Sequence, residues 1–264
     1  AAGPFLAPHE MANDSKAKMA EKLERAAYVS EFRRIFGASI FSNPDDAFDR
    51  ATLAIAAFEK EAPEFHPFDS KYDAFLAGKA ELNAQELRGL ALFNDPQKGN
   101  CAGCHPSTRA NGQAPLFTDF TYDNLGIPRN TAIAATADPA YFDLGLCGPD
   151  RKDLADRTDL CGAFKVPSLR NVAITAPYFH NGKFNSLREV VSFYVRRDTN
   201  PEEWYPSGMN GIEKFNDLPP EYRKNVNTSE APYNRKLGDK PALDSDEIDA
   251  VVAFLNTLTD GYQP

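Results

Sequence analysis

The sequence lacks the features that mark membrane-spanning and nucleic-acid-binding proteins. No apolar run approaches the roughly 18 residues that a membrane-spanning helix needs. Basic residues are outnumbered, and the formal net charge of −9 argues against binding to nucleic acid or to an anionic membrane surface. Residues 1–4, AAGP, have neither the basic start nor the apolar core of a signal peptide. The 264 residues, with no internal repeat or low-complexity tract, suffice for one large or two modest domains.

Cysteine is also scarce, but the spacing of two of the four cysteines is informative. Residues 100–105 read NCAGCH, and C-x-x-C-H is the attachment signature of a c-type haem. Two thiols three positions apart can each bond one vinyl group of a porphyrin, and the histidine that follows can ligate the iron. We therefore expect one covalent haem c, bound by Cys101 and Cys104 with His105 as the iron ligand.

Two other interpretations of a C-x-x-C pair fit the sequence less well. A zinc site needs a second ligand pair at short spacing, which Cys147 and Cys161 do not provide. A thioredoxin-like redox motif follows a strand, whereas residues 83–94 have a helical pattern and Pro106 follows the motif.

Covalent haem implies an exported protein, so we expect a mature or trimmed chain located in the periplasm. In an exported protein the remaining pair, Cys147 and Cys161, suggests a disulfide that closes the polar loop 148–160. Two free buried thiols are the alternative, and the sequence leaves it open.

Helix signals are frequent and strand signals are rare. Residues 106–170 and 198–243 read as long loops, and such loops usually wrap something. The fold class expected is therefore mainly α, with a c-type cytochrome domain with long irregular loops over residues 81–264 and a helical segment over residues 1–80. Helices are expected to begin near Ser15, Ser30, Asn43, Asn83, Ser186 and Asp244, and the one after Asn43 is expected to be largely buried through Phe58. Tyr72, Ala74 and Phe75 mark a further short helix that ends at Gly78.

Two blocks of sequence carry a resemblance to a known family. Residues 164–172 read FKVPSLRNV and residues 175–182 read TAPYFHNG, and the likeness continues through 187–194. With Pro4 and residues 8–11 at the start, the chain resembles the bacterial di-haem cytochrome c peroxidase and MauG family over nearly its whole length. The resemblance implies that residues 1–80 are the remainder of a second, peroxide-binding cytochrome-like domain.

The chain departs from this family in one large respect, because it has a single C-x-x-C-H motif. By position this motif belongs to the electron-transfer haem. The tryptophan that the family places between its haems is also missing, since Trp204 lies far downstream. We expect a truncated, cleaved or separately encoded C-terminal portion, with a second haem only if an upstream domain or chain exists.

Tyr194 is the candidate for the second axial ligand. Peroxidases of the family carry a methionine at this position, and MauG-like members carry a tyrosine that ligates the iron. In the helix expected after Ser186, Tyr194 shares a face with Leu187 and Val191, so it points inward with apolar residues. A core tyrosine whose hydroxyl bonds within the protein is the alternative reading, and Met209 is the fallback ligand.

The resemblance implies roles for three further residues. Glu10 corresponds to the family's acidic general acid/base above the peroxide-binding haem, although a solvated loop carboxylate fits the sequence equally well. Thr175 and Pro177 correspond to positions whose backbone carbonyls help to hold calcium. His180 is expected to be a structural residue near the haem, and His9 a surface group.

Taken together, we expect a peroxidase-type enzyme, a periplasmic haem c oxidoreductase that passes electrons through its covalent haem for hydrogen peroxide reduction or for peroxide-driven oxidation. The alternative is a single-haem electron-transfer cytochrome c without peroxidase activity. The expected partners are a small cationic redox protein and an upstream haem domain or second chain. The family also forms homodimers.

Overall fold

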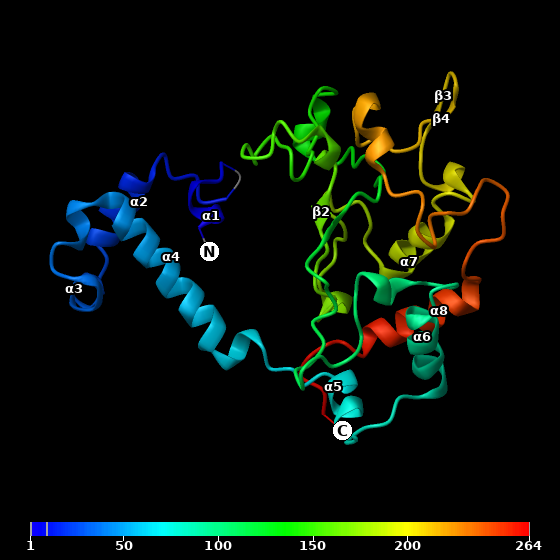
Figure 1. Ribbon diagram of the computed structural model, residues 1–264, viewed down its shortest axis with the longest axis horizontal. Coiled ribbons are helices and arrows are strands. Elements are labelled where there is room, and N and C mark those ends of the chain that lie inside the picture. The colour runs from blue at the N-terminus through cyan, green and yellow to red at the C-terminus, as the bar shows by residue number, and fades with distance from the viewer. Residues whose placement is uncertain (1, 9, 264) are drawn as a thin grey trace. The chain divides into compact units, whose positions relative to one another are not determined.

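The computed structural model describes residues 2–8 and 10–263 and divides the chain into two compact units, residues 1–67 and 68–264 (Figure 1). The first unit is helical. Its helices are α1 (Gly3–Leu6), α2 (Lys16–Glu24), α3 (Val29–Phe36) and α4 (Pro44–Glu61), with 3-10 turns η1 (Ile40–Ser42) and η2 (Pro63–Phe65).

The second unit combines four α-helices with long irregular segments. The helices are α5 (Lys71–Leu76), α6 (Ala84–Asn94), α7 (Leu187–Arg196) and α8 (Ser245–Asn256). The 3-10 turns are η3 (Cys101–Gly103), η4 (Ala134–Ala137), η5 (Thr158–Leu160), η6 (Val172–Ile174), η7 (Pro201–Glu203) and η8 (Pro220–Asn225).

Strands are short in the part of the chain that the structure describes. β1 (Tyr122–Asp123) pairs antiparallel with β2 (Phe164–Lys165), and β3 (Ser207–Gly208) pairs antiparallel with β4 (Gly211–Ile212). The prediction of a mainly α protein with long irregular loops is therefore confirmed. None of the helices among the described residues is both long and apolar enough to cross a membrane.

Local sequence signals explain where the helices of the second unit begin. Reciprocal capping boxes join Asn83 to Glu86, Ser186 to Glu189 and Asp244 to Glu247, as their spacing predicts. Ser70 and Asp73 form a fourth box at α5. Each cap satisfies backbone N–H groups that the helix itself leaves unpaired, typically for about 1 kcal/mol.

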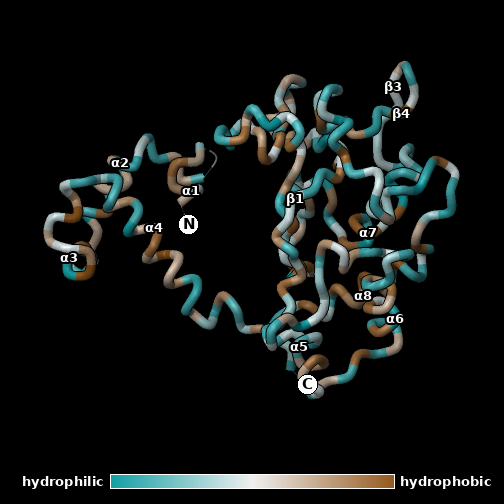
Figure 2. The backbone as a smooth tube through the Cα atoms, viewed as in Figure 1, coloured by the Kyte–Doolittle hydropathy of each residue, from teal (hydrophilic) through white to brown (hydrophobic). Residues whose placement is uncertain are grey.

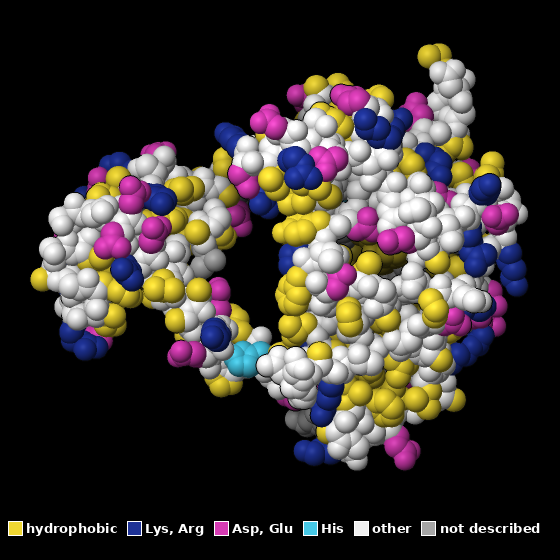
Figure 3. Space-filling model, in the orientation of Figure 1, with side chains coloured by type: hydrophobic (Ala, Val, Ile, Leu, Met, Phe, Trp, Pro, Cys, Tyr) yellow, Lys and Arg dark blue, Asp and Glu magenta, His cyan; other side chains and the backbone are white. Residues whose placement is uncertain are grey.

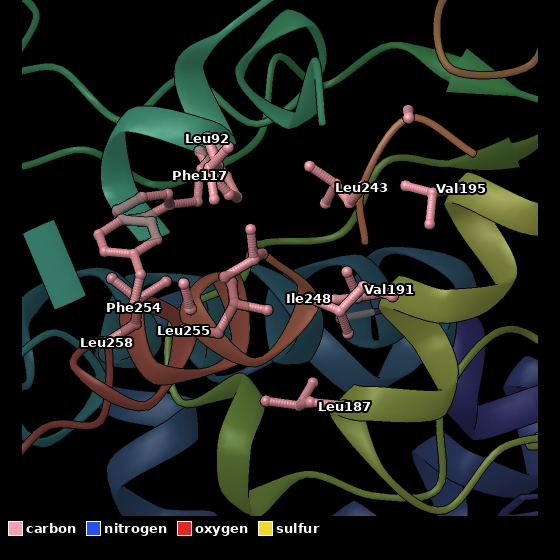
Figure 4. Close-up of a cluster of buried hydrophobic side chains, with 14 of the residues drawn as sticks. Leu92, Phe117, Leu187, Val191, Val195, Leu243, Ile248, Phe254, Leu255 and Leu258 are labelled. Atoms are coloured by element: carbon pink, nitrogen blue, oxygen red, sulfur yellow. The ribbon is translucent and has the colours of Figure 1, made fainter. Parts of the chain in front are cut away.

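The core of the second unit lies where α6, α7 and α8 meet. Figure 4 shows Leu92 of α6, Val191 of α7 and Leu255 of α8 among the side chains that gather between these helices. Hydrophobic stretches follow the same three helices in Figure 2, whereas much of the irregular chain is hydrophilic. The core fixes α6, whose carboxyl end leads into the C-x-x-C-H motif.

Gly89 allows α6 and α8 to approach closely. A Cβ at this position would overlap the carbonyl oxygen of Ala250 and lie 2.9 Å from the Cβ of Phe254. Backbone cannot move aside as a flexible side chain can, so this position requires glycine in spite of its cost in helix propensity.

One expectation about the first unit is wrong. The helix after Asn43 is not largely buried: only Ala47, Phe48 and Ala51 are buried, whereas Leu53 is 55% exposed and Phe58 is 61% exposed. The core formed with α2, α3 and η1 covers only the first turns of α4. An apolar pattern predicts the helix, but it does not show how far neighbouring elements extend along it.

The predicted disulfide is present. Cys147 and Cys161 are bonded, with a Cα–Cα distance of 5.0 Å, and both residues are buried. The bond closes an irregular loop that has little packing of its own. In the chain-entropy model such a loop closure stabilises the fold by about 3 kcal/mol.

We expect Gly89→Ala to lower the free energy of unfolding by about 2 kcal/mol or more, because the added methyl group forces α6 away from α8. Thermal and urea unfolding of the second unit would measure the loss. Ala91→Leu, an exposed enlargement on the same helix, should change stability by less than about 0.5 kcal/mol. Equal effects of the two substitutions would contradict the close-approach argument.

Candidate haem-binding site

The C-x-x-C-H motif lies on a tight turn directly after α6. The N–H of Gly99 donates to the carbonyl of Leu92, and Asn100 adopts a left-handed conformation with φ of 50°. A Cβ at Gly99 would lie 2.9 Å from that carbonyl oxygen and 3.1 Å from Cys101 Sγ. The turn thus folds the motif back against α6.

Both thiols of the motif are free and line one cavity. Burial raises the pKa of Cys101 to about 12 and that of Cys104 to about 11. Redox-active dithiols and metal-binding cysteines depend instead on a thiolate, which is favoured by a lowered pKa. The two cysteines are therefore neutral thiols at physiological pH.

His105 is oriented as a metal-ligating histidine. Its Nδ1 lies 2.7 Å from the carbonyl oxygen of Phe117, and because a carbonyl can only accept, Nδ1 carries the proton. This tautomer leaves the lone pair of Nε2 free, as in histidines that bind a metal through one nitrogen and a backbone carbonyl through the other. Burial lowers the pKa of His105, which keeps the imidazole neutral.

α7 forms another wall of the same cavity. Leu187, Val190, Val191 and Tyr194 all line it, so the helix face expected from the sequence is the face that meets the cavity. Burial raises the pKa of Tyr194. The Tyr194 hydroxyl has no hydrogen-bond partner among the described residues, although a buried tyrosine hydroxyl normally finds one.

The cavity is large and mainly apolar, with an acidic component. Its volume is about 910 Å³, near the upper end of the roughly 300–1,000 Å³ typical of ligand and cofactor sites. Figure 3 shows a hollow in the second unit, with hydrophobic side chains inside it and acidic ones beside it. The acidic and basic residues that line the cavity, apart from His105 and His180, are Asp119, Asp123, Asp217, Glu230 and Lys165.

Comparisons with known proteins agree with this geometry. A family model described as di-haem cytochrome c peroxidase matches residues 1–81. Methylamine utilization protein MauG of Paracoccus denitrificans is 38% identical over 274 residues, covering 99% of this chain and 65% of that protein. Cytochrome c551 peroxidase of Nitrosomonas europaea is 32% identical over 268 residues, covering 100% of this chain and 58% of that protein. The crystal structure of the diheme peroxidase BthA from Burkholderia thailandensis matches with a TM-score of 0.86 and 40% identity, covering 98% of this chain and 62% of that one.

The chain belongs to the di-haem cytochrome c peroxidase and MauG family. It spans somewhat less than two thirds of the length of the relatives named above.

A charged cluster that sequence reasoning missed forms a further part of the wall. Asp217 is buried, and its Oδ2 lies 2.9 Å from Asn181 Nδ2 and 3.4 Å from His180 Nε2. Its Oδ1 lies 3.4 Å from Arg129 Nη1. The His180 ring stacks on Phe164 with centroids 3.7 Å apart. Asp217 lies in a stretch without helical or strand periodicity, so its position beside His180 could not be read from the sequence.

The other predicted residues lie in different places. Thr175 and Pro177 line the cavity, and their backbone carbonyls accept no hydrogen bond within the described part of the chain. Glu10 is exposed in the first unit, and His9 lies outside the described residues. Met209 is fully exposed on the β3–β4 turn and does not line the cavity, so the fallback assignment of Met209 as a ligand is wrong.

The raised pKa values predict slow alkylation of Cys101 and Cys104 in the folded, haem-free chain. At pH 8 a thiol of pKa about 11 is only about 0.1% thiolate, against about a quarter for an unfolded cysteine of pKa about 8.5. Iodoacetamide labelling should be at least about 100-fold slower in the folded chain than in urea, and should accelerate as the pH rises from 8 to 10. Rapid labelling at pH 7 would point to a redox dithiol instead.

Proposed function

We propose that this chain binds one covalent haem c in the 910 Å³ cavity. The observation that carries the proposal is the meeting of three groups on its wall: two neutral thiols, a histidine whose free nitrogen is Nε2, and a tyrosine hydroxyl without a partner. A c-type haem would provide vinyl groups for the two thiols to bond, and an iron for the histidine and the tyrosine to bind. Cys101 and Cys104 would form the thioethers, and His105 and Tyr194 would hold the iron.

A haem bound there would supply a one-electron redox couple whose potential depends on axial ligands, hydrogen bonding and burial. His105, held by the Phe117 carbonyl, fixes the orientation of one ligand. Tyr194 is a hard anionic donor when deprotonated, which favours the ferric state and a low potential. If His105 and Tyr194 both bound the iron, they would hold the group for electron transfer and would leave no room at the iron for peroxide.

For the whole protein we propose a periplasmic oxidoreductase of the cytochrome c peroxidase and MauG type. The haem of this chain would pass electrons to or from a second haem, where peroxide is reduced or drives the oxidation of a substrate. Glu10 would act there as the general acid/base, moving a proton between the oxygens of peroxide. Tyr194, in place of a methionine, favours the MauG-like branch.

A single-haem electron carrier is the second candidate function. It is favoured by one observation: His105 and Tyr194 line the same cavity, so both could bind one iron and would then leave it no open position for peroxide. The two functions differ in the number of haems in the intact native protein.

The charge of the chain also supports an expected partner. The formal net charge of −9 favours a cationic redox protein as electron donor or acceptor. We further propose that the unbonded carbonyls of Thr175 and Pro177 provide oxygen ligands for calcium.

The proposal predicts one haem per chain, measured by pyridine haemochrome against protein mass. Cys101→Ser with Cys104→Ser should abolish covalent haem, whereas Cys147→Ser with Cys161→Ser should retain it while lowering stability. Haem-free wild-type protein, produced in cells competent for haem attachment, would contradict haem binding. In the intact native protein, two haems and peroxide-dependent oxidation support the enzyme, and one haem without it supports the carrier.

Tyr194→Phe should change the absorption spectrum of the ferric haem and raise its reduction potential, because an anionic donor to ferric iron is lost. We expect at least a tenfold shift in the ferric-to-ferrous ratio, which is about 59 mV for a one-electron couple. Tyr205→Phe is the matched control, since its buried hydroxyl donates to the Gly126 carbonyl at 2.6 Å. An unchanged spectrum in Tyr194→Phe would refute ligation.

A further inference from the structure

Besides Tyr194, the cavity is lined by another tyrosine that the sequence did not bring to notice, Tyr233. Tyr233 is 7% exposed and lines the cavity wall. Its ring centroid lies 6.1 Å from that of Tyr194, with 33° between the ring planes. The residue belongs to the long irregular segment before α8, so no helical or strand periodicity places it.

The position of the Tyr233 ring is fixed by a buried cation. Arg197 is completely buried, and its guanidinium carbon lies 4.3 Å from the centroid of the Tyr233 ring. Arg197 follows Tyr194 by three positions, so α7 and its cap residue direct both side chains to the same side.

Arg197 also joins separate segments of the cavity wall. Its Nη1 donates to the carbonyl of Leu125 at 2.9 Å and its Nη2 to the carbonyl of Asn227 at 2.6 Å, and both of these residues line the cavity. Nε donates to Asp198, whose other oxygen binds Lys214 at 2.5 Å. Because every one of these groups is paired, the guanidinium is held rigidly beneath Tyr233.

The segment that carries Tyr233 is tied to the haem-attachment motif. The side-chain Nδ2 of Asn100, directly before Cys101, donates to the carbonyl of Ala231 at 2.8 Å. Tyr233 is therefore positioned from two directions, by the motif and by α7.

Tyr233 lines the cavity, and its hydroxyl has no hydrogen-bond partner among the described residues. The haem-attachment motif and the end of α7, which position the Tyr233 ring, both belong to the described residues, and neither provides a hydrogen-bond partner for the hydroxyl. Among the described residues, the side-chain polar atoms that are both fully buried and without a partner are Arg196 Nε and Trp204 Nε1. The unpaired Tyr233 hydroxyl is not one of them, so it is not fully buried and must border an open space. The space that this residue lines is the cavity.

We propose that Tyr233 is a positioning residue of the haem site, whose hydroxyl donates a hydrogen bond to an anionic oxygen of the assembled centre. This inference rests on the haem binding proposed above. A rigid hydroxyl directed at the cofactor site gains a strong, charge-assisted bond from such an acceptor. Two oxygens have this chemistry: the phenolate of Tyr194 and a haem propionate.

Tyr233→Phe in the haem-loaded chain tests the proposal, because the ring and its contact with Arg197 are kept and only the hydroxyl is lost. Loss of the donor leaves the anion less stabilised, which favours ferric iron. The reduction potential should fall, with about a tenfold shift in the ferric-to-ferrous ratio, or 59 mV. Tyr205→Phe, which removes an equally buried hydroxyl that is bonded to protein, should not shift the ratio by as much as twofold.

Double variants identify the acceptor. If Tyr233→Phe has no further effect in a Tyr194→Phe background, the acceptor is the phenolate, and if its effect persists, the acceptor is a propionate. Tyr233→His, which keeps a ring N–H donor, should restore the potential toward the wild-type value.

The proposal is overturned if Tyr233→Phe retains haem with a spectrum and potential like those of the wild type. If Tyr233→Phe incorporates no haem, the His variant decides: wild-type haem content and potential support a donor role, and absence of haem overturns it in favour of ring packing alone. Wild-type protein without haem is a separate outcome, which defeats the proposed function itself.

Discussion

The contact between α6 and α8 at Gly89 is the constraint on which the rest of the second unit depends. It seats the carboxyl end of α6, and therefore the turn that carries Cys101, Cys104 and His105, against a core shared with α7. The same core holds α7 so that Tyr194 faces the cavity from another wall. A cofactor site made from residues far apart in sequence thus depends on helix packing rather than on the loops that surround it.

The mainly apolar cavity contains polar groups of a particular kind. Its thiols are neutral, His105 is a neutral imidazole with one nitrogen already bonded, and the hydroxyls of Tyr194 and Tyr233 have no hydrogen-bond partner among the residues that the structure describes. Leaving polar groups without partners in an apolar pocket costs free energy. A bound group that forms bonds to all of them converts this cost into binding energy, which is why the cavity fits a cofactor better than a passing substrate.

The parts of the fold that follow local rules were predictable from the sequence. The helix starts at Asn83, Ser186 and Asp244 and the inward face of α7 depend on residues within one or two turns. The C-x-x-C-H motif is also local, because the chemistry of attachment fixes its spacing. Asp217, Arg197 and Tyr233 were missed because each lies in irregular chain or at a helix end, and its burial depends on segments distant in sequence. The exposure of Phe58 on α4 has the same cause, since it depends on where neighbouring elements stop.

The disulfide has a consequence for how the protein matures. Cys147 and Cys161 are bonded to each other, whereas Cys101 and Cys104 are free thiols, and the haem attachment proposed above would require them to stay reduced until it takes place. Four thiols can form two disulfides in three ways, and all three consume Cys101 and Cys104; only a chain with the single Cys147–Cys161 bond leaves the pair of the C-x-x-C-H motif free. One pair lies in an irregular loop and the other on the turn after α6, so the two cysteines of each pair are close together in sequence. The main hazard during maturation is therefore a premature bond between Cys101 and Cys104, rather than a bond between cysteines of different pairs.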